Sequence, residues 1–218
     1  MSLYDLSLFF LFYFNLLWYV TYALVLRRGY LDKMAGIPLI SLTLNLAWDF
    51  TGAFIMPSPS VQMILNSSFL LINALITLQW FRYWRNDFKQ LSALEFYFFW
   101  AFAQVASFVF IIRGSVELND VILSKVGFID NFINSALFIP MLYRRPALEG
   151  QSIYIGLSKL IGTGSSSLAF TFAPFPGPLA DSIIMNPLMI GIFILDIVYV
   201  VLYYVKARRL GINPWRRW

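Results

Sequence analysis

Three carboxyl groups lie deep within long apolar stretches of the chain, at Asp49, Asp130 and Asp196. An ionisable side chain is costly inside a bilayer, so each of the three is a candidate functional residue. A protonated carboxyl group in a water-poor pocket can donate a proton to a substrate. The remaining eight of the eleven acidic residues lie between the apolar stretches or at their edges. Among these we interpret Glu95, near a predicted helix start, as a carboxylate favoured by the helix dipole.

Asp49 belongs to a short polar motif. Asn45, Trp48 and Asp49 stand at positions i, i+3 and i+4, which share one face of a helix. With a rise of 1.5 Å per residue, Asp49 is expected about 10 Å below the outer end of its helix. Two interpretations follow: a hydrogen-bonding cluster that joins helices, or an acid and its neighbours beside a bound substrate.

The other two acids have polar neighbours at helical spacing. Asp196 is about nine residues into the last apolar stretch and therefore roughly 13 Å deep, near the middle of a bilayer. Tyr199 and Tyr203 follow it at i+3 and i+7. Asp130 is also deep and has Asn134 at i+4. For Asp130 we favour a role in helix packing, because amide and small polar side chains commonly join transmembrane helices.

Further polar and aromatic residues occur within the apolar stretches. Lys159 is expected to extend its long side chain to the membrane surface. The faces of aromatic rings attract cationic centres, so some rings could line a cavity in which positive charge develops. The candidates for such a lining are Tyr19, Tyr22, Trp48, Trp100 and Tyr199.

Several kinds of chemistry are excluded by what the sequence lacks. There is no His and no Cys, which excludes disulfides, thiolate nucleophiles and histidine acid–base catalysis. There is no aspartate-rich motif of the DDxxD type for binding a diphosphate through metal ions, and no glycine pattern for binding a nucleotide. We therefore predict that the protein uses no metal and no organic cofactor.

The elements that must position these residues are predicted to be helices. The chain is 60% hydrophobic and only 12% charged, whereas a soluble protein carries about 25% charged residues. Each apolar stretch approaches the roughly 20 residues that cross a bilayer. We predict an all-α integral membrane bundle of seven transmembrane helices that forms a single domain over residues 1–218, with the first stretch retained rather than cleaved. The stretches lie near residues 6–26, 34–56, 63–81, 93–112, 121–143, 152–173 and 187–205.

The distribution of basic residues predicts the orientation of the bundle. Thirteen Lys and Arg residues follow the first, third, fifth and seventh stretches, and only Arg113 and Lys125 lie on the alternate side. Basic residues accumulate in cytoplasmic loops, which places the N-terminus outside and the C-terminus in the cytoplasm. Prolines in the segments 57–60 and 174–178 predict stiff outer loops. The formal charge of +5 is explained by this asymmetry, and nothing in it indicates nucleic-acid binding.

The motif at Asn45, Ala47, Trp48, Asp49 and Phe50 resembles that of the membrane-integral terpene cyclases of fungal meroterpenoid and indole-diterpene pathways and of bacterial indole-sesquiterpene pathways. Those proteins are similarly short, have about seven spans and carry an Asn-x-Ala-Trp-Glu-Phe motif in the second span. Upstream, Pro38 fits their pattern. In the last span they carry a second acid followed three residues later by Tyr, which Asp196 and Tyr199 match. One departure is that Asp49 stands where the fungal proteins usually have Glu, so its carboxyl reaches less far.

The resemblance implies a cyclase that folds a prenyl chain by carbocation chemistry started by a proton, without a cofactor. Asp49 would protonate the olefin or epoxide at the far end of a prenyl chain carried by a meroterpenoid or indole acceptor. Asp196 would hold the acid, position the substrate or assist deprotonation. Asn45, Trp48, Tyr199, Trp100 and Tyr22 would bind the substrate. The membrane would be a bacterial plasma membrane, or the endoplasmic reticulum of a eukaryote.

Two other classes of protein fit parts of the pattern. In a seven-span carrier or channel for a small solute, the intramembrane Asp, Asn and Lys residues would form a binding site or a proton relay. Against this, paired segments lack the Gly or Pro interruptions of many transporters. A scaffold subunit is the third interpretation, and it predicts no pocket. The sequence makes no prediction of the oligomeric state.

Overall fold

The computed structural model describes residues 3–56, 60–172 and 183–218, and the regular elements in these ranges are all helical. No strand is present there, so the all-α prediction is confirmed. Of the predicted outer loops, residues 57–59 and 174–178 lie outside the described ranges. A π-helical segment, Thr51–Ile55, and a 3-10 turn, Pro214–Arg216, accompany the α-helices. The α-helices are α1 (Leu3–Asp32), α2 (Leu39–Phe50), α3 (Ser60–Asp87), α4 (Ala93–Glu117), α5 (Ser124–Arg144), α6 (Ile153–Phe172) and α7 (Met185–Arg209).

Several helix bounds differ from those of the apolar stretches, and α3 and α2 illustrate the differences. Helix α3 continues to Asp87, six residues past the predicted end at Phe81, because backbone hydrogen bonding persists where the side chains become polar. The second helix begins later than predicted, at Leu39. Its N-cap is Pro38, which has an extended backbone with φ −59° and ψ 142°. Its α-helical part ends at Phe50, and the chain then widens into the π-helix.

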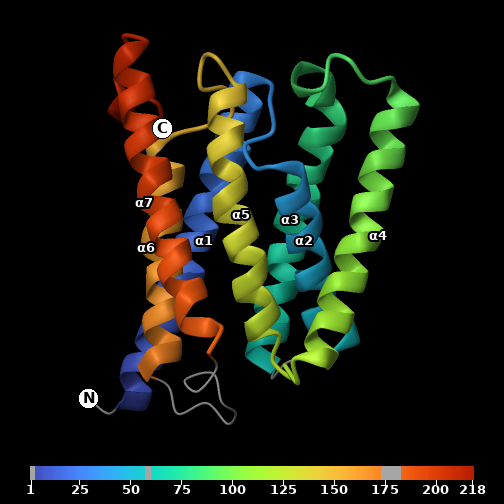
Figure 1. The fold of residues 1–218 in the computed structure, drawn as a ribbon, viewed down its shortest axis with the longest axis vertical. Helices are drawn as coiled ribbons and strands as arrows, with labels where there is room; N and C mark the ends of the chain where they lie inside the picture. Colours follow the sequence, from blue (N-terminus) through green and yellow to red (C-terminus); the bar gives the residue numbers. More distant parts are fainter. Residues whose placement is uncertain (1–2, 57–59, 173–182) are drawn as a thin grey trace.

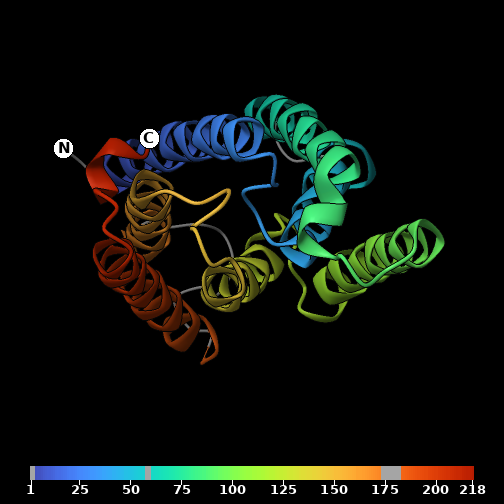
Figure 2. The ribbon, with the colours of Figure 1, turned by 90° about the horizontal axis from the view of Figure 1, so that it is seen from above.

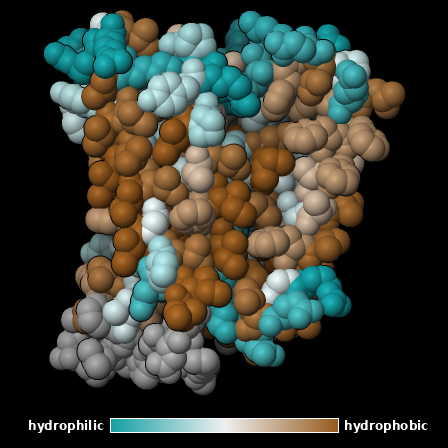
Figure 3. All heavy atoms as spheres, in the orientation of Figure 1, coloured by the Kyte–Doolittle hydropathy of each residue, from teal (hydrophilic) through white to brown (hydrophobic). Residues whose placement is uncertain are grey.

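On the face drawn in Figure 3, the described part of the bundle is mostly apolar, with polar side chains gathered towards its two ends. Five helices in the described part of the chain are long and apolar enough to cross a membrane, namely α1, α3, α4, α5 and α7. The α2 segment with its π-helix, Leu39–Ile55, is apolar but shorter. A broad band of exposed apolar side chains is typical of a surface that lies in the hydrocarbon region of a bilayer.

Successive α-helices run up and down the bundle, so that the connections α1–α2, α3–α4 and α5–α6 gather at one end (Figure 1). Helix α1 packs most extensively on α6, and α5 packs on α7. Helix α2 lies against both α3 and α4. Figure 2 shows α4 at the outer edge of the bundle, where it packs mainly on α2.

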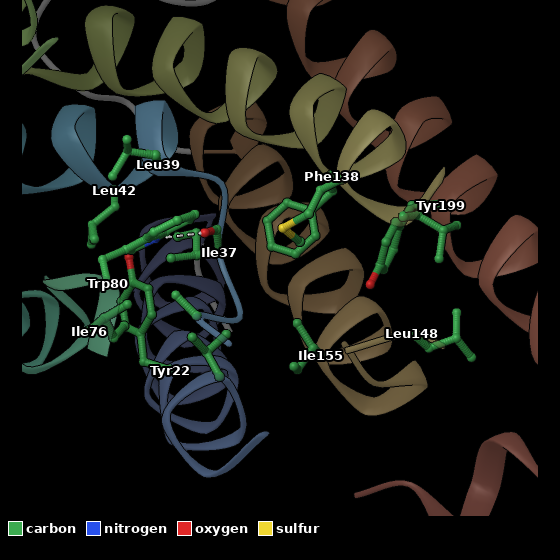
Figure 4. Packing of buried hydrophobic residues seen from close by; sticks show 14 of the residues in the cluster. Tyr22, Ile37, Leu39, Leu42, Ile76, Trp80, Phe138, Leu148, Ile155 and Tyr199 are labelled. Atoms are coloured by element: carbon green, nitrogen blue, oxygen red, sulfur yellow. Dashed lines mark hydrogen bonds between the residues drawn. The ribbon is translucent and has the colours of Figure 1, made fainter. Parts of the chain in front are cut away.

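A large apolar core lies towards the end where those three connections meet. Trp80 is 1% exposed and donates a hydrogen bond from Nε1 to the carbonyl oxygen of Ile37 at 3.1 Å (Figure 4). This bond fixes the segment that leads into α2. In another part of the same core Phe138 packs edge-on against Tyr199, with ring centroids 5.3 Å apart. The core thus fixes the start of α2 and the C-terminal halves of α5 and α7, the three helices that carry the acidic residues.

Ion pairs close this end of the bundle. Arg145 is fully buried; its guanidinium bonds to Asp87 at 2.8 Å and to the carbonyl oxygen of Ala35 at 2.7 Å. In the segment after α7, Arg217 pairs with Asp32 at 2.7 Å and also donates to the carbonyl oxygen of Leu148. The C-terminal segment is therefore bound to the end of α1 and to the α5–α6 connection.

Candidate functional site

A cavity of about 270 Å³ lies between α1, α2 and α5, with further walls from α3 and α6. It is nearer the end of the bundle that holds the α4–α5 connection, since Ile122 and Leu123 of that connection line it. Most of its wall is apolar, as is usual for sites that bind small organic molecules. The aromatic lining residues are Phe14, Trp18, Tyr22, Trp48, Phe69, Phe128 and Phe170. The polar ones are Asn15, Asn45, Asp49, Gln62, Ser124, Asp130, Asn131, Asn134 and Ser166.

Helix α2 contributes the motif residues to this cavity as one face. Asn45, Trp48 and Asp49 all line it, as the i, i+3, i+4 spacing predicts. Asp49 is 3% exposed, and its Oδ2 accepts a hydrogen bond from Nδ2 of Asn73 at 2.8 Å. Asn45 donates from Nδ2 to the hydroxyl oxygen of Tyr22, on α1, at 3.2 Å. The acid therefore sits in a polar corner of an otherwise apolar space.

The indole ring of Trp48 is held in place from the other side of the cavity. Its Nε1 donates to the carbonyl oxygen of Leu123 at 2.8 Å. Gly127 on α5 leaves room for the ring, because a Cβ atom there would lie 3.0 Å from Trp48 Nε1. One residue after Asp49 the α-helix gives way to the π-helix, a conformation that is frequent at functional sites.

Asp196 lies outside the cavity lining, in a separate polar cluster between α5, α6 and α7. Its Oδ1 accepts from Nζ of Lys159 at 2.6 Å, and its Oδ2 accepts from Oγ1 of Thr163 at 2.9 Å. Lys159 also donates to Oγ of Ser135 at 2.5 Å. The expectation that Lys159 reaches the membrane surface is wrong. The side chain is 2% exposed, because a carboxylate on α7 is available to it at the same depth.

The aromatic candidates divide into two groups. Tyr22 and Trp48 line the cavity, whereas Tyr19, Trp100 and Tyr199 are not among its lining residues. The Tyr199 hydroxyl donates to Oε1 of Gln151 at 3.2 Å, near the opposite end of the bundle. Trp100 packs edge-on against Phe81, with ring centroids 4.9 Å apart. Residue type alone does not say which way a ring faces, which is why the sequence could not separate these groups.

The sequence interpretation missed the contribution of α5 and much of α1. Asp130 lines the cavity together with Asn131 and Asn134, although helix packing was the favoured interpretation for it. The helical spacing of the residues on these two helices could have predicted that they line the cavity. Gly127, Asp130, Asn131 and Asn134 form one stripe of a helix, and Leu11, Phe14, Asn15, Trp18 and Tyr22 form another on α1.

Comparison with known proteins identifies the family. Residues 3–209 match the family described as Pyr4-like transmembrane terpene cyclases. The chain belongs to this family. It is therefore an integral membrane enzyme of the terpene cyclase type.

Curated proteins of the terpene cyclase type are similar to the chain along most of their length. The chain is 23% identical to "Pyr4-family terpene cyclase mfmH" of Annulohypoxylon moriforme, over 87% of this chain and 81% of the relative. It is 25% identical to "Terpene cyclase olcD" of Penicillium canescens, over 88% and 81%. It is 23% identical to "Terpene cyclase cle7" of Aspergillus versicolor, over 88% and 83%. No solved structure matches the chain.

Proposed function

We propose that this Pyr4-like cyclase closes rings in a prenyl chain by donating a proton from Asp49. The substrate would be a prenyl chain, as olefin or epoxide, on a small acceptor of the meroterpenoid or prenylated-indole type. The observation that carries the proposal is the position of Asp49, a buried carboxyl group on the wall of a mainly apolar, aromatic-lined cavity. The names of the three curated relatives above, all of them terpene cyclases, support a substrate of this chemistry.

The hydrogen bond from Asn73 defines how Asp49 would act. Because Oδ2 accepts from the Asn73 amide, the acidic proton would be carried on Oδ1. Transfer of that proton to the terminal alkene carbon, or to an epoxide oxygen, leaves a carbocation that the next double bond attacks. The cation then passes along the chain as successive rings close. No metal or organic cofactor takes part in this scheme.

The aromatic wall would stabilise the migrating positive charge. Trp48 and Tyr22 lie beside the acid, and the ring of Trp18 packs on Tyr22 at a centroid separation of 5.3 Å. Ring faces attract a cation most strongly where water is excluded. With Asn45, which holds the Tyr22 hydroxyl, these residues form the proposed substrate-binding surface. Tyr199 and Trp100 would support the shape of the site from a distance rather than touch the substrate.

Asp196 is proposed as a positioning residue. It is bound to Lys159 and Thr163 and does not line the cavity, so it would act through the lysine rather than on the substrate. This differs from a direct role in donating or accepting the substrate's protons. The sequence interpretation had Asp196 hold the acid, position the substrate or assist deprotonation, and the present proposal gives it an indirect role.

We infer that all seven α-helices cross the membrane, with the N-terminus outside and the C-terminus in the cytoplasm. The basic-residue count supports this, as does the gathering of the α1–α2, α3–α4 and α5–α6 connections at one end. In this orientation the Asp49 cavity lies in the outer half of the bilayer. A solute carrier, the alternative class, is not favoured by the family assignment.

Product analysis tests the proposal. The gene would be co-expressed with enzymes that supply farnesyl- and geranylgeranyl-bearing phenolic, pyrone and indole acceptors, each with and without a terminal epoxide. We expect a cyclic isomer of the same mass from at least one of them, and none from the Asp49→Asn variant. Absence of any cyclic product across the panel, with the protein present in the membrane, would reject the proposed function.

A further inference from the structure

Asp130 is a second carboxyl group on the cavity wall, and the mechanism above does not use it. It lies on α5, whereas Asp49 lies on α2, so the two acids belong to different walls of one cavity. The side chain of Asp130 is 6% exposed, and its Oδ1 has no hydrogen-bond partner within the protein. Buried polar atoms nearly always have a partner. Because Asp130 lines the cavity, its carboxyl group can meet a molecule that occupies the space.

The neighbours of Asp130 on α5 are polar but cannot titrate. Asn131 and Asn134 line the same cavity, and each has a buried side-chain oxygen without a partner in the protein. Ser124, at the start of α5, is bonded to Asp120. Among the described lining residues of α5, Asp130 alone can take up a proton at ordinary pH. Among the described lining residues of α5, Asp130 is therefore the one side chain that can accept a proton from a bound molecule.

Asp130 interacts with ionisable groups on two other helices. Lys159 on α6 interacts electrostatically with Asp130, and it is fixed by its bonds to Asp196 and to Ser135. Asp49 on α2 also interacts electrostatically with Asp130. Burial disfavours a negative charge on Asp130, and the ammonium group of Lys159 offsets part of that cost, more strongly in a poorly solvated interior than in water. Asp130 is thus coupled electrostatically both to the ammonium group of Lys159 and to the acid that releases the proton.

We propose that Asp130 is the proton acceptor that ends cyclisation; this inference rests on the proposed function. In the last step a C–H bond next to the cationic carbon breaks, and its electron pair forms a C=C double bond. The proton goes to the carboxylate of Asp130, which becomes a neutral carboxylic acid. One proton enters from Asp49 and one leaves to Asp130, so the product is an isomer of the substrate and no oxidant or reductant is needed.

The cycle then requires the proton to return. After the product leaves, Asp49 is a carboxylate and Asp130 is neutral, and both line one cavity. A proton moves from Asp130 to Asp49, directly or through water that refills the cavity, and both groups regain their starting states. The Lys159–Asp196 pair keeps its charge throughout and serves to hold Asp130 near a positive centre.

Separate readouts for initiation and termination test this assignment. Asp130→Asn keeps the shape of the side chain but removes the proton acceptor. With a prenylated substrate that the parent enzyme converts, formation of the parental product should fall by about 100-fold or more, as loss of a general base usually causes. Substrate consumption should fall less, and other alkene isomers or alcohols formed by water capture should replace the parental product. In D2O these products should still gain one deuterium, since Asp49 is intact.

The control is Glu95→Gln, the same change at a carboxyl group on the exposed start of α4, which should leave rate and products unchanged. A parental product from Asp130→Asn at the parental rate, or with only a raised KM, would overturn the inference and indicate a packing or substrate-anchoring role. If Asp130→Asn does not accumulate, Asp130→Glu replaces it. A carboxyl displaced by one C–C bond should shift the position of the new double bond, and an unchanged product would count against the assignment. If the parent enzyme converts no prenylated substrate, the proposed function itself fails.

Discussion

Lys159 and Asp196 form an ion pair between α6 and α7, with Nζ 2.6 Å from Oδ1 and both side chains almost completely buried. Removing one partner of such a pair leaves an isolated charge in a poorly solvated interior, which costs more than removing both. The stability of the bundle therefore depends on Asp196, the acid in the last helix that matches the family pattern.

We expect Asp196→Asn and Lys159→Met to destabilise the protein by about 3–5 kcal/mol each, and the double variant to recover a large part of the loss. Thermal unfolding in detergent measures this. The matched control is Glu117→Gln in the exposed pair Arg113–Glu117, where the side chains are 69% and 70% exposed and about 0–1 kcal/mol is expected. If the double variant is no more stable than the less stable of the two single variants, the two charges do not compensate each other.

Asp49→Asn should abolish cyclisation while leaving folding intact. The amide keeps the volume and can still bond to Asn73, but it cannot protonate an alkene or epoxide. The loss should be several orders of magnitude, about 4 kcal/mol or more in the barrier. Asp49→Glu restores the acid at a displaced position and should retain about 1% of the activity. Rates are compared at equal amounts of monodisperse protein, and an Asp49→Asn protein near the parental rate would remove Asp49 from the mechanism.

Gly127→Ala should alter the shape of the cavity at Trp48. The added Cβ would lie 3.0 Å from Nε1 of the indole, so the ring must shift, and its bond to the Leu123 carbonyl should weaken. We expect a changed ratio of cyclic products, read by mass spectrometry and NMR, with a smaller change in total turnover. Gly164→Ala on α6 is the matched control, because a Cβ there meets nothing within 4 Å. Equal product ratios in both variants would show that the position of Trp48 does not control ring closure.

Single cysteines test the orientation cleanly, because the chain contains no Cys. Val121, 78% exposed in the α4–α5 connection, is predicted to face outside, and the exposed Gln90, between α3 and α4, is predicted to face the cytoplasm. A membrane-impermeant maleimide added to intact cells should label Val121→Cys and not Gln90→Cys. After the membrane is opened, both should react. Labelling of Gln90→Cys alone in intact cells would reverse the topology.

The sequence predicted the helical class and the α2 face well, because both depend on local periodicity. Asn45, Trp48 and Asp49 meet the cavity together since helical spacing fixes their relative directions. The pairing of Lys159 with Asp196 could not be predicted, because it depends on how α6 and α7 face each other. The same limit applies to Asp130, whose carboxyl group meets the cavity only through the placement of α5 against α1 and α2. The single-domain prediction is not tested by these observations.

The burial of Lys159 has a consequence for how the protein enters the membrane. Helix α6 is absent from the five described helices that are apolar enough to cross on their own, and it carries a lysine whose carboxylate partner is synthesised 37 residues later. A lysine at the centre of an isolated helix costs about 3 kcal/mol during insertion by the translocon. We therefore expect stable insertion of α6 to be delayed until α7 has been synthesised and Asp196 can pair with Lys159. Until then α6 would remain at the translocon or packed against α1. If translation were stalled before Asp196, the nascent chain would contain an α6 that is not yet stably inserted in the bilayer.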